Sequence, residues 1–99
     1  MAVYCGWDGG GTHTTVLVSG PDGQELARGA FGPLNLNGNP ADTVADTIRQ
    51  AVGFMNGHGA CRGLVIGMAG ISNRDAADFI TRQVRVCGYE GPLRLVGDQ

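Results

Sequence analysis

Lysine is absent from this 99-residue sequence, and all seven basic side chains are arginines. Without lysine the chain has no residue for a Walker A phosphate loop, a Schiff base or a lysine general base. Charged residues make up only 16% of the chain, and the formal net charge is -2. A charge this close to neutral offers no electrostatic basis for binding nucleic acid or an anionic membrane.

Cysteines are few and widely spaced: Cys5, Cys61 and Cys87 show neither a CxxC motif nor a metal-ligand spacing. Because His13 and His58 are also far apart, we expect no zinc site and interpret the cysteines as small, buried apolar side chains. We find no apolar run of membrane-spanning length and no signal-peptide pattern ahead of the first strand-like segment. These features predict a cytoplasmic protein with no membrane partner.

The sequence does contain a regular succession of apolar segments separated by glycine-rich turns. β-branched and aromatic residues favour strands, whereas apolar residues three or four positions apart favour helices. The pattern predicts strands at 2–7, 14–19, 24–31, 63–69 and 93–96. The continuous apolar run at 63–69 is typical of a strand that is buried on both faces.

Two helices are expected between the later strands. Asn39 and Pro40 are typical of the N-cap and first position of one helix, which Gly57 and Gly59 would end. The second helix is expected to begin near residues 72–75 and to end before Gly88.

The resulting order is β-β-β-α-β-α-β. A three-stranded meander followed by two right-handed crossovers predicts a mixed five-stranded sheet in the order 3-2-1-4-5. This is a ribonuclease H-like α/β fold. Residues 1–99 then form a single domain, which we expect to be the incomplete N-terminal part of a larger protein, lacking a final helix and a C-terminal domain. The uncovered sheet face is expected to cause self-association or poor solubility.

A glycine-rich stretch, DGGGTH at residues 8–13, separates the first two strands. A dinucleotide loop requires a third spaced glycine and a following helix, and a Walker A loop requires lysine, so both are excluded. We interpret the stretch as a β-hairpin in which Gly9, Gly10 and Gly11 can adopt positive φ angles and their N–H groups can bind an anion, together with the Thr12 hydroxyl. Asp8 would repel a bare phosphate, so it is expected to act through Mg²⁺. A hairpin without a ligand is the alternative.

The predicted topology brings polar residues from distant parts of the chain to one edge of the sheet. Asp8, Asn35, Gly70 and Asp98 each follow a strand that points in the same direction. Ligands of open α/β sheets bind outside the carboxyl ends of the strands. We therefore expect one cleft at this edge.

The stretch DGGGTHT at residues 8–14 resembles the DGGGTKT hairpin of the BadF/BadG/BcrA/BcrD-type ATPase family. That family includes the N-acetylglucosamine and glucosamine kinases of the actin and sugar-kinase superfamily. GPLN at 32–35, GMAG at 67–70 and VGD at 96–98 are similar, in the same order, to later motifs of the family. His13 stands where lysine is common, Ala69 where some relatives have a hydroxyl residue, and Gly97 where asparagine is usual.

The resemblance implies an actin-like ATPase fold and an ATP-dependent kinase of an amino sugar, with ATP and Mg²⁺ as cofactors. Its implied residue roles are the general base at Asp98, sugar contacts at Asn35, Gly70 and Asp98, a Mg²⁺ ligand at Asp8, and an ATP phosphate site at Gly9, Gly10, Gly11, Thr12 and His13. It also implies a C-terminal domain with the adenine pocket, so that residues 1–99 alone would be inactive.

Other functions and assemblies stay open at this point. One is an ATPase activator of a 2-hydroxyacyl-CoA dehydratase type enzyme, although that class needs cluster-binding cysteines that the spacing here does not match. Another is a non-catalytic nucleotide- or sugar-binding module. A homodimer is also open.

Overall fold

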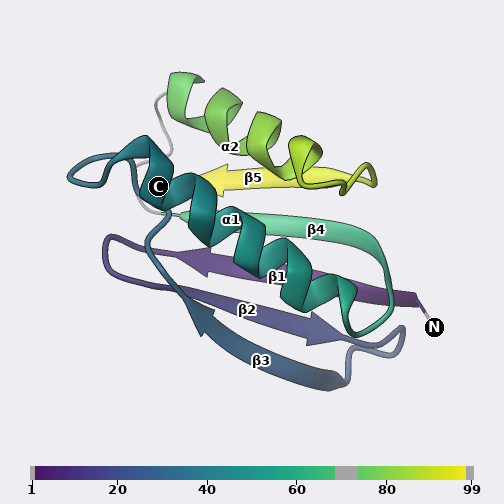
Figure 1. Cartoon of the computed structure of the whole chain (residues 1–99). Helices are drawn as coiled ribbons and strands as arrows, with labels where there is room; N and C mark the ends of the chain where they lie inside the picture. The colour runs from purple at the N-terminus through teal and green to yellow at the C-terminus, as the bar shows by residue number, and fades with distance from the viewer. Residues whose placement is uncertain (1, 69–73, 98–99) are drawn as a thin grey trace.

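The computed structural model describes residues 2–68 and 74–97, which form a mixed sheet with both helices on one side (Figure 1). In chain order the elements are β1 (Ala2–Gly9), β2 (Thr14–Ser19), β3 (Glu25–Phe31), α1 (Ala41–Asn56), β4 (Ala60–Met68), α2 (Arg74–Val86) and β5 (Leu93–Gly97). The five strands lie in the order β3-β2-β1-β4-β5. The predicted ribonuclease H-like α/β class, element order and strand order are confirmed. Neither described helix is long and apolar enough to cross a membrane.

The carboxyl ends of four strands meet at one edge of the sheet. β1 pairs antiparallel with β2 and parallel with β4, and β3 pairs antiparallel with β2, so β3 runs in the same direction as β1. Gly9 at the end of β1 pairs with Met68 of β4, and Met68 pairs with Gly97 of β5. This register places the hairpin after β1 and the segment after β3 at the same edge, as the sequence predicted.

The hydrophobic core lies between the sheet and the two helices. α1 buries one apolar stripe because its apolar residues recur at helical spacing. The stripe consists of Val44, Ile48, Ala51, Val52 and Met55. Each fully buried large aliphatic side chain stabilises the fold by about 1.5–3 kcal/mol relative to an exposed one. Because this packing fixes α1 against the sheet, the sheet edge that carries the hairpin also has a fixed position relative to α1.

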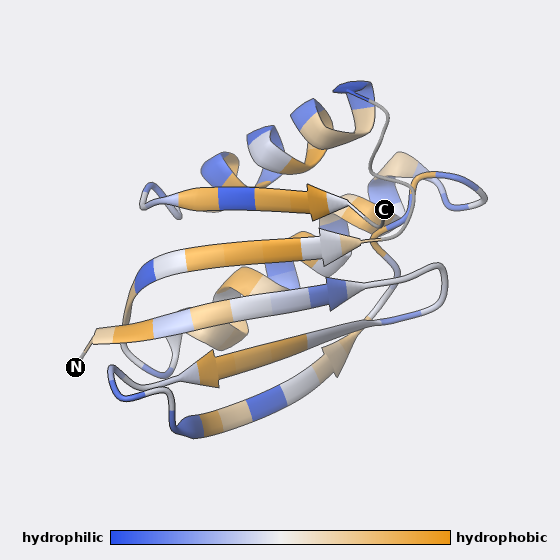
Figure 2. Cartoon of the chain, turned by 180° about the vertical axis from the view of Figure 1, so that it is seen from behind, coloured by the Kyte–Doolittle hydropathy of each residue, from blue (hydrophilic) through white to orange (hydrophobic). Residues whose placement is uncertain are grey.

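The opposite face of the sheet is not covered by any helix of the described part of the chain (Figure 2). Along β4, Leu64, Ile66 and Met68 are buried, whereas the intervening Val65 is 45% exposed. The prediction that this strand is buried on both faces is therefore wrong within the described residues. An apolar run shows that a strand is apolar on both sides, but not that a layer packs on each side.

The C-terminal ends of both helices agree with the sequence prediction, whereas the start of α1 does not. Pro40, not Asn39, occupies the N-cap position, and no side chain caps the helix. The predicted cap role of Asn39 is therefore wrong. Gly57 is the C-cap residue of α1, and Gly88 ends α2 with a φ of 102°, where its N–H donates to the Arg85 carbonyl at 3.0 Å. The predicted cap of the second helix at Ser72 and Asn73 lies outside the described residues.

The three cysteines are free thiols, and only Cys5 is fully buried, so the interpretation as buried side chains is wrong for Cys61 and Cys87, which are half-buried. A hydrogen bond between the Cys5 and Cys61 side chains raises the pKa of Cys5 and lowers the pKa of Cys61 to about 6. The Tyr89 hydroxyl lies close to this pair, and burial raises the pKa of Tyr89 to about 12. The two thiols therefore differ in acidity because they interact.

Candidate functional site

The glycine hairpin connects β1 to β2, and its tip extends beyond the carboxyl end of β1. The Gly10 N–H donates to the His13 carbonyl at 3.0 Å, which closes the turn. Thr12 and His13 are exposed, and the Thr12 hydroxyl is hydrogen-bonded to Nδ1 of the His13 ring at 3.2 Å. Gly11 and Thr12 are exposed residues, and their N–H groups donate to no other described residue, which leaves these groups available to a ligand.

The three glycines serve the hairpin in a way that differs from the prediction. None of Gly9, Gly10 and Gly11 has a positive φ angle, so the expected left-handed tip is wrong. Gly9 is required for close packing instead, because a Cβ atom there would lie 2.7 Å from Cδ1 of Leu34. At Gly11 a Cβ atom would meet nothing within 4 Å. At Gly10 a Cβ atom would lie 3.4 Å from the His13 carbonyl oxygen, so of the three glycines Gly11 is the one that leaves open space at the tip.

A loop of residues 32–39, which follows β3, is hydrogen-bonded along the side of the hairpin. The buried Thr14 hydroxyl donates to the Gly32 carbonyl at 2.8 Å. The N–H groups of Leu34 and Asn35 both donate to the Gly10 carbonyl, at 3.1 and 3.4 Å. The hairpin and this loop therefore form one hydrogen-bonded unit.

Asn39 adds the outermost link of this unit. Its Nδ2 donates to the Gly11 carbonyl at 3.2 Å and to the Asn35 carbonyl at 2.8 Å. The sequence pattern of Asn before Pro pointed to a helix cap and gave no signal for this contact. The partner at Gly11 lies 28 positions away in the chain, so only the fold reveals it.

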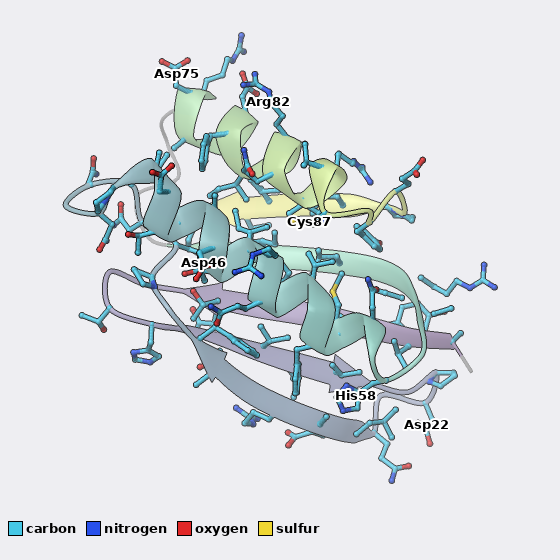
Figure 3. The ribbon with its side chains drawn as sticks, in the orientation of Figure 1. Asp22, Asp46, His58, Asp75, Arg82 and Cys87 are labelled. Carbon is cyan, nitrogen blue, oxygen red and sulfur yellow. The ribbon has the colours of Figure 1, made fainter. Side chains whose placement is uncertain are left out.

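Asn35, the predicted sugar contact, lines a pocket of about 260 Å³. The pocket is bounded by the 32–39 loop, the end of β4 and the first turns of α2, where Figure 3 labels Asp75. Its lining residues are Asn35, Leu36, Asn37, Met68, Asp75, Ala76 and Phe79. The Asn35 Oδ1 accepts a hydrogen bond from the Asn37 N–H at 2.8 Å, so the side chain is held in place and its Nδ2 is left to donate.

Asp8 lies at the same edge but on the open face of the sheet. It is exposed and lines a hollow of about 400 Å³, together with Thr15, Arg28 and Val96 among others. Across residues 2–68 and 74–97 no group of three or more His, Cys, Asp or Glu side chains could hold a metal ion together. A Mg²⁺ ion at Asp8 would therefore take most of its ligands from water and phosphate oxygens, which is the usual protein coordination of Mg²⁺.

The structure thus brings Asn35 against the hairpin tip and leaves Asp8 on the other face of the same sheet end. Gly70 and Asp98, the remaining predicted site residues, lie outside the described residues. Met68 lies two residues before Gly70, and Gly97 lies one residue before Asp98. Met68 and Gly97 pair with each other at this edge.

Comparisons with known proteins agree with an actin-like fold. No protein-family model matches the sequence. The N-acetylmuramic acid/N-acetylglucosamine kinase of Clostridium acetobutylicum is 29% identical over 105 residues, which cover 99% of this chain and 34% of that kinase. A solved protein assigned as an N-acetylglucosamine kinase from Chromobacterium violaceum has a TM-score of 0.69 and 22% identity, over 96% of this chain and 34% of that chain.

A structural neighbour that was solved with a DNA junction limits what the structural likeness means. RuvC of Thermus thermophilus, solved with a Holliday junction substrate, has a TM-score of 0.61 and 17% identity, over 98% of this chain and 65% of that chain. Because proteins with such different ligands share this fold, the structural likeness shows the fold alone. The sequence match, together with the fold, supports the actin-like sugar-kinase superfamily. The chain spans about a third of the length of the curated kinase that it matches.

Proposed function

We propose that this chain is the N-terminal part of an ATP-dependent kinase that phosphorylates an amino sugar, N-acetylglucosamine or glucosamine. The observation that carries the proposal is the sequence match to an N-acetylmuramic acid/N-acetylglucosamine kinase over 99% of the chain. The resemblance of the motifs at residues 8–14, 32–35, 67–70 and 96–98 to those of the BadF/BadG/BcrA/BcrD-type family further supports the proposal.

The hairpin tip fits the phosphates of ATP. Gly11 and Thr12 are exposed residues whose N–H groups make no hydrogen bond to another described residue, and the Thr12 hydroxyl lies beside them. Backbone donors of this kind bind phosphate oxygens without the lysine that the sequence lacks. Bound Mg²⁺, held at Asp8, would supply neutralisation of the phosphate charge.

The pocket at Asn35 fits the acceptor sugar. A carboxamide donor and a mixed polar and apolar lining are suited to hydroxyl groups on a ring with an apolar face. Asp98 is proposed to accept the proton of the attacking hydroxyl. A positioned base of this type contributes about 10²–10⁴-fold to the rate. The remaining catalysis comes from holding the two substrates at the same edge of the sheet.

The remainder of the protein is proposed to supply what residues 1–99 do not. A second domain would carry the adenine pocket, and the protein would act in the cytoplasm. The 99-residue chain alone should then bind MgATP weakly and transfer no phosphate. Micromolar affinity of this chain for MgATP in a calorimeter would contradict that.

Two other functions compete with the kinase. An activator of a 2-hydroxyacyl-CoA dehydratase type enzyme would hydrolyse ATP without a sugar and would need cysteines that bind a cluster. Cys5 is buried and Cys87 lies at the end of α2, at the far end of the helix from Asp75 (Figure 3), so no observation favours this function. A non-catalytic binding module would release no ADP at all.

A substrate screen of the full-length protein separates these functions. ADP release is measured with MgATP and glucosamine, N-acetylglucosamine, glucose or no sugar. The proposal predicts ADP release that depends on an amino sugar. Release without a sugar indicates the activator type of ATPase, and no release indicates a binding module.

The base assignment is tested by Asp98→Asn in the full-length protein. We expect this variant to retain the fold and MgATP binding but to lose about 10²–10⁴-fold in phosphoryl transfer, because the amide cannot accept the proton. The measurement is the turnover number at saturating substrates, with calorimetric MgATP affinity as the control. Turnover close to that of the wild type would show that Asp98 is not the base.

A further inference from the structure

Asn39 stands immediately before the N-cap residue of α1, but its side chain bonds backward, away from the helix. Its two hydrogen bonds go to the carbonyl groups of Gly11, on the tip of the hairpin, and of Asn35, in the loop that lines the pocket. These two residues belong to the two parts of the site that would bind different substrates. One carboxamide thus connects the two parts directly.

The contact has a specific chemical requirement. A carboxamide nitrogen carries two N–H donors and Asn39 uses both, each on a backbone carbonyl. A carboxylate of the same shape has no donor and would place its charge against two carbonyl oxygens. Serine has one donor on a shorter side chain, and alanine has none. Asparagine is therefore the short side chain that satisfies both carbonyls.

The rest of the connection lies deeper in the hairpin. The Gly10 carbonyl accepts from the N–H groups of Leu34 and Asn35, and Leu34 is completely buried against Gly9. Gly11 is exposed and has no packing neighbour at its Cβ position, so the Asn39 contact is the bond that fixes this end of the tip. Removing it should leave the base of the hairpin in place and release the tip.

We infer that Asn39 is a positioning residue, whose carboxamide holds the phosphate-binding tip at a fixed distance from the sugar pocket during phosphoryl transfer. The inference rests on the proposed kinase function. Loss of the contact should affect the alignment of the two substrates more than the binding of either one. A misplacement of about 1 Å between reacting groups costs about 10²-fold in rate.

The test uses Asn39→Asp in the full-length protein, with Asn56→Asp as the matched control. Asp at position 39 keeps the side-chain shape and places a negative charge near a helix N-terminus, where it is favourable, so folding should be retained. Asn56 is exposed at the other end of the same helix and has no side-chain hydrogen bond, and it lies outside the site. Three quantities are measured: kcat, the KM for each substrate, and ADP released per sugar phosphate formed.

For Asn39→Asp we expect kcat to fall about 10²-fold, with each KM changed by less than about threefold, and more ADP released per sugar phosphate because water competes for the phosphoryl group. Asn56→Asp should behave as the wild type. A purely structural role would lower ADP release and sugar phosphate in the same proportion as the folded fraction, which would overturn the inference. Wild-type kinetics of Asn39→Asp would overturn it as well.

Amide hydrogen exchange tests the contact separately from catalysis. In Asn39→Asp the Gly10 N–H, which closes the turn on the His13 carbonyl, should exchange about tenfold faster, because the tip loses its hydrogen bond from Asn39. The N–H groups of Leu34 and Asn35, at the base of the hairpin, should keep their exchange rates. Unchanged exchange at Gly10 would show that Asn39 does not hold the tip, whatever the enzyme does. If the wild type phosphorylates no sugar, the proposed function fails, and with it the role of Asn39 in transfer.

Discussion

Gly9 and Gly11 show that residues of one type within one motif have separate roles. At Gly9 the missing Cβ makes room for Leu34, which is completely buried. At Gly11 the missing Cβ leaves a surface open, and nothing in the described structure occupies the space. The same residue type therefore serves two purposes in this motif: Gly9 allows close packing, and Gly11 leaves space for a ligand.

Alanine substitutions should separate the two roles. Gly9→Ala is expected to destabilise the fold by about 1–3 kcal/mol, because its new methyl group overlaps the Leu34 side chain. Gly11→Ala should change stability by less than about 0.5 kcal/mol, since its site is exposed. Urea unfolding of both variants measures the difference. Equal stabilities would show that Leu34 does not pack on Gly9 as described.

The acidity of Cys61 is a further prediction about single residues. Because the Cys5 side chain is hydrogen-bonded to Cys61 and lowers its pKa to about 6, we expect Cys61 to react as a thiolate at neutral pH. Alkylation of Cys61 by iodoacetamide, followed by peptide mass spectrometry, should show a rate that falls only as the pH drops through about 6.

Cys5→Ala should move this inflection upward, toward the usual thiol value of about 8.5, because the hydrogen bond is lost. Cys87→Ala serves as the control and should leave it in place. A wild-type inflection already at the usual value would disprove the interaction.

The sequence identified candidate site residues by type and position along the chain, but it did not identify all of their contacts. The motif after β1 and Asn35 after β3 were identified from local patterns, and the structure brings them together. Asn39 was predicted to cap α1 because Asn before Pro is a typical local cap pattern. In the structure its side chain instead donates to the Gly11 carbonyl, and no side chain caps the helix. Local sequence does not show which carbonyl group the side-chain amide of an asparagine will bind in the folded protein.

At the scale of elements, strand and helix positions followed from periodicity, and the structure confirms them to within a few residues. The predictable part was the side of α1 that faces the sheet, since its apolar stripe admits only one orientation. The exposure of β4 was not predictable, because an apolar strand looks the same whether one or two layers cover it. Val65, with apolar neighbours on both sides in sequence, is the residue that shows this.

The two helices offer a paired prediction on glycine. Gly53 lies inside α1, is exposed, and would place a Cβ atom in open space, so Gly53→Ala should stabilise the protein by about 0.5–1 kcal/mol. Gly88 ends α2 at a φ of 102°, which is unfavourable for alanine, so Gly88→Ala should destabilise it by about 1–2 kcal/mol. Thermal unfolding of the two variants gives the comparison. Shifts of the same sign would contradict the assigned end of α2.

At the scale of the whole molecule, the sheet has one covered face and one that no described helix covers (Figure 2). Tyr4, Leu26, Val65 and Val96 are large apolar side chains exposed on the strands. Apolar surface that is exposed on an open sheet face favours association between molecules. The 99-residue chain in isolation is therefore expected to self-associate.

Sedimentation velocity of the 99-residue chain tests this expectation. Val65→Lys should shift the chain toward monomer, because the charge would lie on the open face. Val86→Lys is the matched control: Val86 is 74% exposed at the end of α2, so the same substitution there should leave the association unchanged. A monomeric wild type at all concentrations, or equal effects of the two substitutions, would show that the open face does not mediate association.

The measurement that most directly tests the proposed kinase is the amount of sugar phosphate formed per ADP released by the full-length protein, with MgATP and N-acetylglucosamine or glucosamine. If the hairpin tip and the Asn35 pocket bind the two substrates of one reaction, ADP and sugar phosphate will appear in equal amounts, and ADP release will stop when the sugar is omitted. ADP release that continues at the same rate without any sugar, or no phosphorylated sugar at all, would contradict it.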